Sequence, residues 1–421
     1  MNQLVNIEQV QLQCKKTQSA AKLLGVSSEQ KKNEILKSMS DLIEKNRLAI
    51  LEANKIDLER AEQSGLSRAM IDRLTINETT IRQMQQALNQ VANLADPLTS
   101  SYPEVVQPSG IKVTKKRIPL GVILMIYESR PNVTVEAAAL ALKSGNGIIL
   151  RGGKEAFESN QAIAQCWREA LIDNEMSADT VNVLNSTDRQ LLDQLLKLDQ
   201  HIEVVIPRGG EGLIRHVVAN SHIPVIKHYK GVCHLYVDEM ADLNMAIDIL
   251  INGKTQRPGV CNALEGLVVH QVIAKQFLQQ AFQALHLKDV QMFGCAETIE
   301  ILPSIDKARE EEFLAEFLDL KISCKVVKNI DQAIDFIDQY GSGHTEVIVT
   351  DSQQNADKFV NRVDASVVMV NASSRFSDGG ELGLGAEIGI STSKIHAYGP
   401  MGLESLTSEK FVVRGNGEVR S

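Results

Sequence analysis

Cys261 lies in the segment of this chain whose residue types most directly suggest chemistry. The surrounding loop, residues 256–262, contains Arg257, a proline and a glycine, and it precedes an apolar run over 264–269. A loop of this kind presents a side chain at the end of an element, where backbone N–H groups or a nearby arginine lower the pKa of a thiol. The resulting thiolate is a strong nucleophile. Cys261 is therefore a candidate catalytic nucleophile, although the loop alone is equally compatible with a structural cysteine.

The other five cysteines lie in segments that suggest no activated thiol. They form no C-x-x-C pair and have no histidine at metal-ligand spacing, so we expect buried, reduced side chains, no structural zinc and a cytoplasmic location. These residues are Cys14, Cys166, Cys233, Cys295 and Cys324.

Three loops of unusual composition follow predicted strands over 118–127, 148–150 and 203–206, and the last two contain a Gly-Gly pair together with arginine or lysine. Backbone N–H groups in glycine loops and at helix N-termini bind anions, and arginine or lysine adds charge suited to phosphate oxygens. A single Gly-Gly loop is usually only a tight turn. Three unusual loops at the same edge of one parallel sheet favour a site for a phosphorylated dinucleotide. The loops are residues 128–133, Arg151-Gly152-Gly153-Lys154 and Pro207-Arg208-Gly209-Gly210-Glu211-Gly212.

Two standard nucleotide signatures are absent from the sequence. Gly253-Lys254-Thr255 has the form of the end of a phosphate-binding P-loop, but Asp248 stands where the earlier glycine is required. No G-x-G-x-x-G follows the first strand, so a dinucleotide would be held in another way. Two polar, glycine-rich loops over 341–346 and 371–380 are typical of ligand-binding segments. The lone His344 is more typical of a hydrogen-bonded structural residue.

The elements that must position these loops alternate between strand and helix. Helical periodicity dominates the first hundred residues, with Ser27 and Gln30 in the form of a capping box. Strands and helices alternate from residue 118 and again from about residue 234, which predicts parallel sheets covered by helices in two domains.

Composition excludes several classes of protein. The 421 residues are 43% hydrophobic and 23% charged, a balance typical of globular domains. A formal net charge of -9 and an aromatic content of 4% argue against nucleic-acid binding. The N-terminus has no export-signal pattern, and no apolar run is long enough to span a membrane.

Seven segments, in this order, resemble the glutamyl-phosphate reductase branch of the aldehyde dehydrogenase superfamily. The resemblance extends from about residue 20 over nearly the whole chain. It is carried by residues 127–133, 149–156, 206–210, 224–228, 256–263, 341–346 and 385–392.

The resemblance implies an α/β, aldehyde dehydrogenase-like fold with two Rossmann-like parallel-sheet domains and a small oligomerisation arm. The NADP-binding domain would comprise residues 1–102 and 118–232, and the catalytic domain residues 233–400. Residues 103–117 and 401–421 would form the arm. A homo-oligomer is implied, as is association with glutamate 5-kinase.

The implied reaction is the NADPH-dependent reduction of L-glutamyl 5-phosphate to L-glutamate 5-semialdehyde and phosphate, in proline biosynthesis. Cys261 would form a thioester, and Asn132 would stabilise the oxyanion. No metal takes part. Arg151, Gly152, Gly153 and Lys154 would contact the adenosine ribose and its 2′-phosphate. Pro207, Gly209 and Gly210 would lie along the pyrophosphate, and Glu346 at the nicotinamide ribose. Substrate anions would meet Arg130, Arg257 and Arg375.

The alternative within the superfamily is an NAD(P)-dependent semialdehyde dehydrogenase of the hydrolytic type. Such enzymes carry a glutamate that activates water, and the resemblance aligns His228 with that position. Loss of the carboxylate base favours the acyl-phosphate reductase.

Overall fold

Two α/β units form this chain in the computed structural model, which describes residues 7–100 and 102–420. The first unit takes the chain up to Lys227, together with Leu384–Gly389 and the part from Met401 onward. The second takes His228–Gly383 and Ile390–Pro400. Each unit is described by itself.

The first unit is built around a four-stranded parallel sheet in the order β5-β4-β3-β6. The first strand of this sheet in the sequence, β3, lies between the later strands β4 and β6, as helical crossover connections allow. Its strands are β3 (Val122–Tyr127), β4 (Gly147–Arg151), β5 (Val181–Val183) and β6 (Val204–Arg208). Its helices are α1 (Ile7–Leu24), α2 (Glu29–Lys45), α3 (Arg47–Gln63), α4 (Arg68–Leu74), α5 (Glu78–Asn93), α6 (Asn132–Lys143), α7 (Phe157–Asp173), α8 (Arg189–Leu195) and α9 (Glu211–Asn220).

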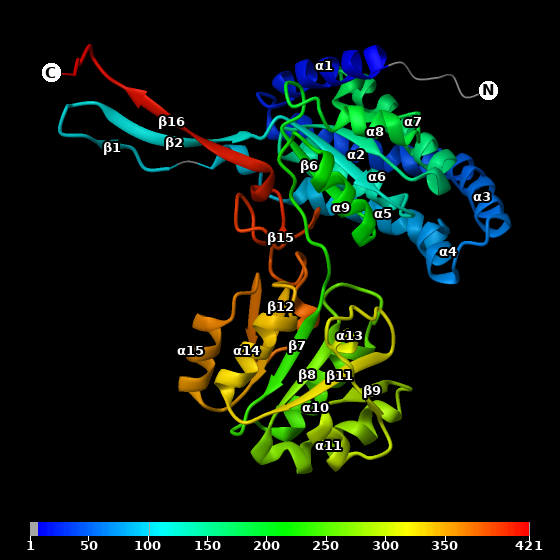
Figure 1. The fold of residues 1–421 in the computed structure, drawn as a ribbon. Helices are drawn as coiled ribbons and strands as arrows, with labels where there is room; N and C mark the ends of the chain where they lie inside the picture. The colour runs from blue at the N-terminus through cyan, green and yellow to red at the C-terminus, as the bar shows by residue number, and fades with distance from the viewer. Residues whose placement is uncertain (1–6, 101, 421) are drawn as a thin grey trace. The chain divides into compact units, whose positions relative to one another are not determined.

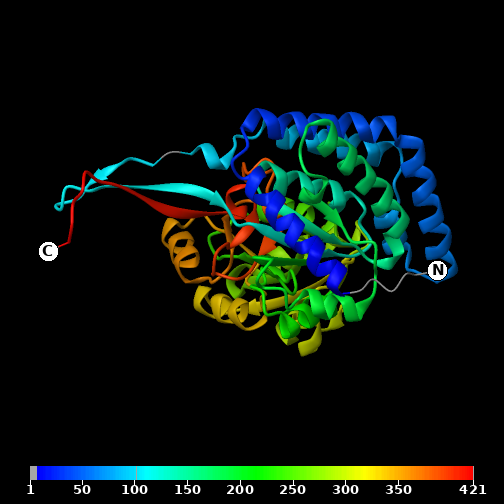
Figure 2. The ribbon, with the colours of Figure 1, turned by 90° about the horizontal axis from the view of Figure 1, so that it is seen from above.

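Side chains of β3 alternate between two apolar layers. Val122, Leu124 and Ile126 pack in one cluster with side chains of α1, α8 and α9. On the other face, the Tyr127 hydroxyl lies 2.6 Å from that of Thr134 in α6. Both faces of β3 are therefore buried, as the continuous apolar run predicts. Figure 2 shows α1 crossing over this sheet.

The predicted strand over 118–127 is interrupted in the structure. Strand β2 (Lys112–Pro119) ends before Gly121, and β3 begins after it. Gly121 has a φ of +132°, and a Cβ there would lie 2.5 Å from the carboxyl carbon of Glu203. The positive φ disfavours any residue with a side chain at this position, and a Cβ would also displace the Glu203 carboxylate.

The segment before this break belongs to a separate ribbon, which we call the arm. It consists of β1 (Val105–Val106), β2 and β16 (Thr407–Arg414), all antiparallel, and β16 pairs with β2 along its whole length. Figure 1 shows β2 and β16 side by side, leading away from the helices of the same unit. Large apolar side chains on the arm are exposed, among them Phe411 and Val413.

The second unit contains a seven-stranded sheet in the order β10-β9-β11-β8-β7-β12-β13, in which every neighbouring pair is parallel. Its strands are β7 (Cys233–Val237), β8 (Leu264–His270), β9 (Gln291–Gly294), β10 (Asp306–Lys307), β11 (Lys321–Val327), β12 (Thr345–Val349) and β13 (Val367–Val370). Its helices are α10 (Leu243–Thr255), α11 (Gln271–His286), α12 (Ala296–Ile301), α13 (Glu310–Phe313), α14 (Ile330–Tyr340) and α15 (Gln353–Arg362). Strands β14 (Gly389–Ser391) and β15 (Gly399–Met401) pair separately.

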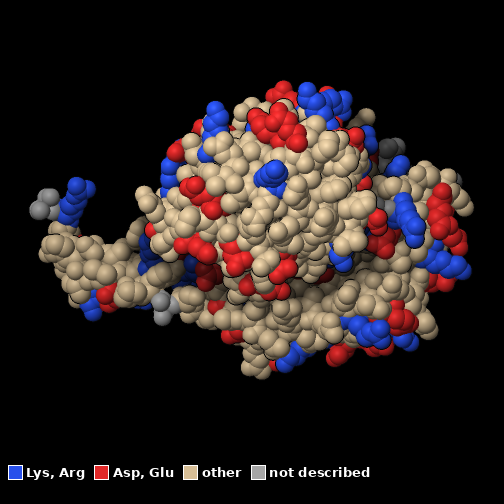
Figure 3. Space-filling model, turned by 90° about the horizontal axis from the view of Figure 1, so that it is seen from below, with Lys and Arg blue, Asp and Glu red and all other residues tan. Residues whose placement is uncertain are grey.

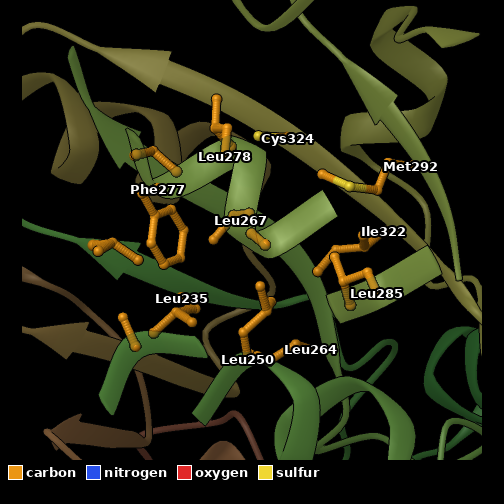
Figure 4. Close-up of a cluster of buried hydrophobic side chains, with 14 of the residues drawn as sticks. Leu235, Leu250, Leu264, Leu267, Phe277, Leu278, Leu285, Met292, Ile322 and Cys324 are labelled. Atoms are coloured by element: carbon orange, nitrogen blue, oxygen red, sulfur yellow. The ribbon is translucent and has the colours of Figure 1, made fainter. Parts of the chain in front are cut away.

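The main core of the second unit lies between its sheet and helices α10 and α11. Leu235, Leu267 and Ile322 from three strands meet Phe277 and Leu285 of α11 there (Figure 4). A second cluster covers the other face with α14 and α15. Helices on both faces of each parallel sheet confirm the predicted α/β class.

Charged side chains of both signs are interspersed on the face drawn in Figure 3, where no broad area of lysine and arginine is visible among the described residues. This distribution agrees with the net charge of -9, and the face drawn offers no basic surface suited to a polyanion. No described helix combines the length and apolarity that a membrane span requires.

Lys254 and Glu265 form a fully buried ion pair that joins α10 to β8. The ammonium nitrogen lies 2.7 Å from the carboxylate and 2.7 Å from the carbonyl oxygen of Leu264. The second carboxylate oxygen accepts the N–H of Leu318 at 3.1 Å. Burial lowers the pKa of Lys254 and raises that of Glu265, to about 7, while their mutual attraction opposes both changes. The apparent end of a P-loop is therefore structural.

We expect Lys254→Met to lower the free energy of unfolding by about 3–5 kcal/mol, because the Glu265 carboxylate loses its partner inside the core. The double variant Lys254→Met/Glu265→Leu should recover most of that loss, since neither charge remains buried. Urea unfolding of the wild type and both variants measures the difference. Equal destabilisation by the single and double changes would contradict this account.

Candidate active site

Cys261 lies in the turn between α10 and β8. The N–H of Ala263 closes the turn on the carbonyl of Val260 at 3.1 Å. Cys261 is half-buried, whereas the other five cysteines are buried and all six are free thiols. Burial raises the pKa of Cys14 and Cys324 to about 12, so these thiols stay protonated. Exposure thus singles out the cysteine that the sequence favoured.

The backbone of Cys261 is held by the segment that leads into β7. A Cβ built on Gly231 would lie 2.0 Å from the carbonyl oxygen of Cys261, so only glycine permits this approach. The N–H of Gly231 donates to Glu316 at 2.8 Å. The Cys233 thiol donates to the same Cys261 carbonyl at 3.2 Å. Burial raises the pKa of Cys233 well above its usual value, which keeps the proton needed for this bond.

Two arginines lie close to the Cys261 turn. Arg375 follows β13 in a short 3-10 turn, and its Nε donates to Gln256 at 2.6 Å. Burial lowers the pKa of Arg375, and the positive charge of Arg257 lowers it further. Two guanidinium groups close enough to repel each other provide a site for an anion.

The turn that carries Arg375 is fixed to the Cys261 turn through Asn262. The Asn262 amide donates to the carbonyl of Ser377 at 2.7 Å, and the Ser374 hydroxyl donates to the carbonyl of Asn262 at 2.7 Å. The predicted polar loop over 371–380 therefore packs against the Cys261 turn within the same unit.

Two histidines lie near these residues. His228 and His344 meet edge to face with ring centroids 6.0 Å apart, and Nδ1 of His228 lies 3.0 Å from the carbonyl oxygen of Ile390. His344 is buried, and its Nδ1 lies 2.8 Å from the Thr345 hydroxyl. These contacts agree with the structural role expected for His344. Position 228 carries an imidazole and no carboxylate.

Glu346 is buried inside the sheet of the second unit. One of its oxygens accepts the backbone N–H of His234 at 2.9 Å and lies 3.1 Å from Nδ1 of the same residue. Burial raises the pKa of Glu346, and its other oxygen has no partner among the described residues. Contact between this carboxylate and a ribose stays a prediction, and the structure assigns the carboxylate a histidine partner.

The three predicted anion-binding loops lie in the first unit, at the carboxyl ends of the neighbouring strands β4, β3 and β6. Tyr127 pairs with Arg208, and Ile126 pairs with Arg151, so these strands end level with one another. The loops therefore share one edge of the sheet, as the alternation of elements predicts. Pro207 is buried within β6, which ends at Arg208, so the loop proper begins two residues later, at Gly209.

The loop after β3 is fixed by Glu155. Ser129 has a φ of +46°, and its N–H and hydroxyl both donate to the Glu155 carboxylate, at 2.7 and 2.9 Å. Asn132 is the first residue of α6, and its amide donates to Glu136 at 3.0 Å. Burial raises the pKa of Glu136, whereas Arg208 and Arg130 counteract that rise. Asn132 is thus held by a carboxyl group one helical turn away.

The other two loops offer hydrogen-bond donors that suit phosphate groups. The N–H of Gly210, at the N-terminus of α9, donates to the Glu128 carboxylate at 3.0 Å. Arg151 donates from Nη2 to the carbonyl of Thr187 at 2.9 Å, and its buried Nε has no partner among the described residues. Lys154 is exposed beside it. An anion on the helix N-terminus and an unsatisfied guanidinium nitrogen both fit a phosphorylated cofactor.

Comparison with known proteins agrees with this geometry. The model of the aldehyde dehydrogenase family matches residues 3–320. The chain belongs to the aldehyde dehydrogenase family. A gamma-glutamyl phosphate reductase from Desulfatibacillum aliphaticivorans is 53% identical over 97% of each chain. Another from Salinibacter ruber is 52% identical over 100% of this chain and 95% of its own length.

Solved structures of aldehyde dehydrogenase family members agree with the fold. The crystal structure of gamma-glutamyl phosphate reductase from Thermotoga maritima, 46% identical, has a TM-score of 0.95 and covers 97% of this chain and 99% of its own. A glyceraldehyde-3-phosphate dehydrogenase from Methanocaldococcus jannaschii, complexed with NADP, is 16% identical with a TM-score of 0.68, covering 98% of this chain and 95% of its own. The predicted aldehyde dehydrogenase-like fold is confirmed, and within the family the chain groups with the gamma-glutamyl phosphate reductases.

Sequence reasoning missed the residues that hold the Cys261 turn in this aldehyde dehydrogenase family member. Gly231, Cys233 and Ser374 contact the Cys261 turn from other strands and loops. Gly231 stands beside the singled-out segment 224–228, but no local pattern connects it to residue 261. Among the described residues, no group of three metal-ligating side chains converges.

We expect Gly231→Ala to abolish most activity, because the added methyl group must displace the Cys261 carbonyl. Gly212→Ala, at a helix position of the first unit where a Cβ meets nothing within 4 Å, is the matched control for the alkylation of Cys261 and should react at the wild-type rate. Turnover, and the rate of Cys261 alkylation by iodoacetamide, provide the measurements. Wild-type values for Gly231→Ala in both would refute the backbone constraint.

Proposed function

We propose that this chain catalyses the NADPH-dependent reduction of L-glutamyl 5-phosphate to L-glutamate 5-semialdehyde and phosphate, the second step of proline biosynthesis from glutamate. The observation that carries the proposal is the half-buried Cys261 beside Arg257 and Arg375, in a chain half identical to gamma-glutamyl phosphate reductases. The reaction would take place in the cytoplasm.

In the proposed reaction, the thiolate of Cys261 attacks the acyl carbon of the substrate. The bond between that carbon and the phosphate oxygen breaks, phosphate leaves with the electron pair, and a thioester remains on Cys261. When bound, the reduced nicotinamide supplies a hydride to the same carbon. The resulting thiohemiacetal loses its hydroxyl proton, the C–S bond breaks, and the aldehyde and free Cys261 thiolate are released.

Asn132 is proposed to stabilise the oxyanion that forms on the acyl oxygen. A correctly aimed amide donor at such a position contributes about 3 kcal/mol to lowering the barrier. The hydrogen bond of Asn132 to Glu136 supports this role, since it fixes one N–H of the amide and thereby the direction of the other. The backbone N–H of Cys261 would be the second donor.

The two arginines near Cys261 are proposed to bind the substrate's anionic groups. Burial and, to a smaller extent, the positive charge of Arg257 lower the pKa of Arg375, and a phosphate or carboxylate between the two guanidinium groups would relieve their repulsion. Arg130, in the loop after β3 of the first unit, is proposed as a third substrate ligand.

The first unit's loops are proposed to hold the cofactor. Arg151, Gly152, Gly153 and Lys154 would lie along the adenosine ribose and its 2′-phosphate, and Pro207, Gly209 and Gly210 along the pyrophosphate. Glu346 of the second unit would meet the nicotinamide ribose. The Gly210 N–H supports this assignment, because it already donates to a carboxylate oxygen and could donate to a phosphate oxygen in the same way. A preference for NADP over NAD would then come from Arg151 and Lys154.

The three-part organisation of the subunit is part of the proposal. Residues 103–117 and 401–421 would act as an oligomerisation arm, residues 1–102 and 118–232 as the NADP-binding domain, and residues 233–400 as the catalytic domain. Exposed apolar side chains on the arm support a homo-oligomer. Glutamate 5-kinase, which makes the unstable acyl phosphate, is the proposed partner enzyme.

The reaction is tested in the reverse direction with glutamate 5-semialdehyde. We expect formation of NADPH to require phosphate or arsenate, because only these anions release the thioester. Cys261→Ser should lower turnover by at least about a thousandfold, since the hydroxyl is a far weaker nucleophile. Cys324→Ser, which replaces a buried thiol in β11, serves as the control and should retain turnover.

Steady NADPH formation without phosphate would instead identify a hydrolytic semialdehyde dehydrogenase. Unchanged turnover of the Cys261→Ser variant would refute the assignment of the nucleophile.

We expect Lys154→Ala to raise the KM for NADPH about tenfold and to leave the KM for NADH nearly unchanged, because only the former has a 2′-phosphate. Lys37→Ala, on an exposed position of α2, is the matched control. Initial-rate measurements with both cofactors distinguish the two. An equal rise in the KM for NADPH and the KM for NADH would show that Lys154 does not contact the 2′-phosphate.

A further inference from the structure

A hollow of about 470 Å³ lies in the first unit, where the arm joins the helices. It is bordered by the C-terminal end of α1, by residues 25–29 and by the root of the arm. Figure 2 shows that end of α1 beside the arm. Its volume is within the range of pockets that bind small molecules.

The hollow is distinct from the proposed active site. Gly121, Val122 and Glu203 line it, and these residues stand at the N-terminal ends of β3 and β6. The three anion-binding loops follow the opposite ends of the same sheet. Strands of this length span roughly 17–20 Å, so a ligand in the hollow would not touch the cofactor loops.

Three lysines around the hollow form no ion pair with a described carboxylate: Lys22, Lys116 and Lys410. Lys116 and Lys410 are direct partners in the antiparallel ladder of β2 and β16, so their side chains lie on the same face of the arm. Like charges directly opposite one another destabilise such a ladder.

The same face of the arm carries a second cation pair, which is neutralised. Lys112 and Arg414 are also direct partners, and Glu104 lies 3.7 Å from the first and 3.1 Å from the second. The fold therefore supplies a carboxylate for the pair that is remote from the hollow and none for the pair that borders it.

The acidic residues of the hollow are already engaged. Asp96 forms a buried ion pair with Lys32, and Glu29 lies 3.0 Å from the ammonium nitrogen of Lys143. Glu203 accepts the N–H of Val122, and burial raises its pKa. The three lysines are thus left with an excess of positive charge on a chain whose net charge is -9.

Apolar groups complete the hollow. Ala21, Leu98, Ile118 and Val122 line it between the charged side chains. A ligand that satisfied both features would place an acidic group among the lysines and an apolar body against these residues.

We propose that the hollow at the root of the arm binds a small anion with an apolar body, of the class of aromatic or branched carboxylates and phosphate monoesters. Lys22, Lys116 and Lys410 bind its acidic group. The bound anion connects α1 to the arm and removes the repulsion between Lys116 and Lys410. This site is independent of the proposed reductase activity.

The test uses phenyl phosphate as the probe and isothermal titration calorimetry on the full chain saturated with NADP⁺. The wild type should bind one equivalent of probe per chain at this site, more weakly as salt is added. Lys116→Ala/Lys410→Ala should weaken that binding about tenfold or more. Lys112→Ala/Arg414→Ala, which changes the neutralised pair on the same face, is the matched control and should bind as the wild type does.

Three results would overturn the proposal. They are no heat of binding with the wild type, binding that Lys116→Ala/Lys410→Ala leaves unchanged, and equal weakening by both double variants. The last would indicate a general effect of arm charge. All four replaced side chains are exposed on the arm, so the variants leave the proposed active site and the core untouched, and thermal unfolding checks that the variants are folded.

Discussion

The buried ion pair of Lys254 and Glu265 is the interaction on which the geometry of the Cys261 turn depends most. It joins the last turn of α10 to the start of β8, and the turn that carries Cys261 lies between these two points. Because the lysine also binds the carbonyl of Leu264, the length and direction of the turn are fixed at both ends. The backbone contact with Gly231 and the hydrogen bond from Cys233 then fix its middle. The backbone that carries the half-buried Cys261 thiol is thus held at both ends and in its middle.

Much of this fold follows from patterns that depend only on neighbouring residues. Apolar runs predict the parallel strands, and the unusual loops after three of them, two with paired glycines and basic residues, predict one functional edge. Local patterns give the wrong boundary of an element where a contact with a residue outside the pattern determines that boundary. The expected capping box at Ser27 is wrong by one residue, because Ser28 accepts the N–H of Lys31 while Gln30 donates to Glu34. The strand break at Gly121 depends on Glu203, which is remote in sequence.

The predicted site shows the same division. Cys261 could be singled out because its loop is unusual in itself. Cys233 could not, since a thiol in an apolar strand gives no sign that a carbonyl lies beside it. Glu346 looks in sequence like a ligand in a polar loop, yet its carboxylate is buried against His234. Long-range contacts of this kind need the packed structure, because they arise from strand order and not from spacing.

The unequal exposure of the six cysteines determines the order in which their thiols are oxidised in solution. Peroxide reacts with accessible thiolates and scarcely with buried thiols, so oxidation reaches Cys261 first. A sulfinic group there would leave the core contacts of Cys14, Cys166, Cys295 and Cys324 intact. The chain would therefore lose its reactive centre while still unfolding as a native protein does, and a preparation's folded fraction would overstate its active fraction.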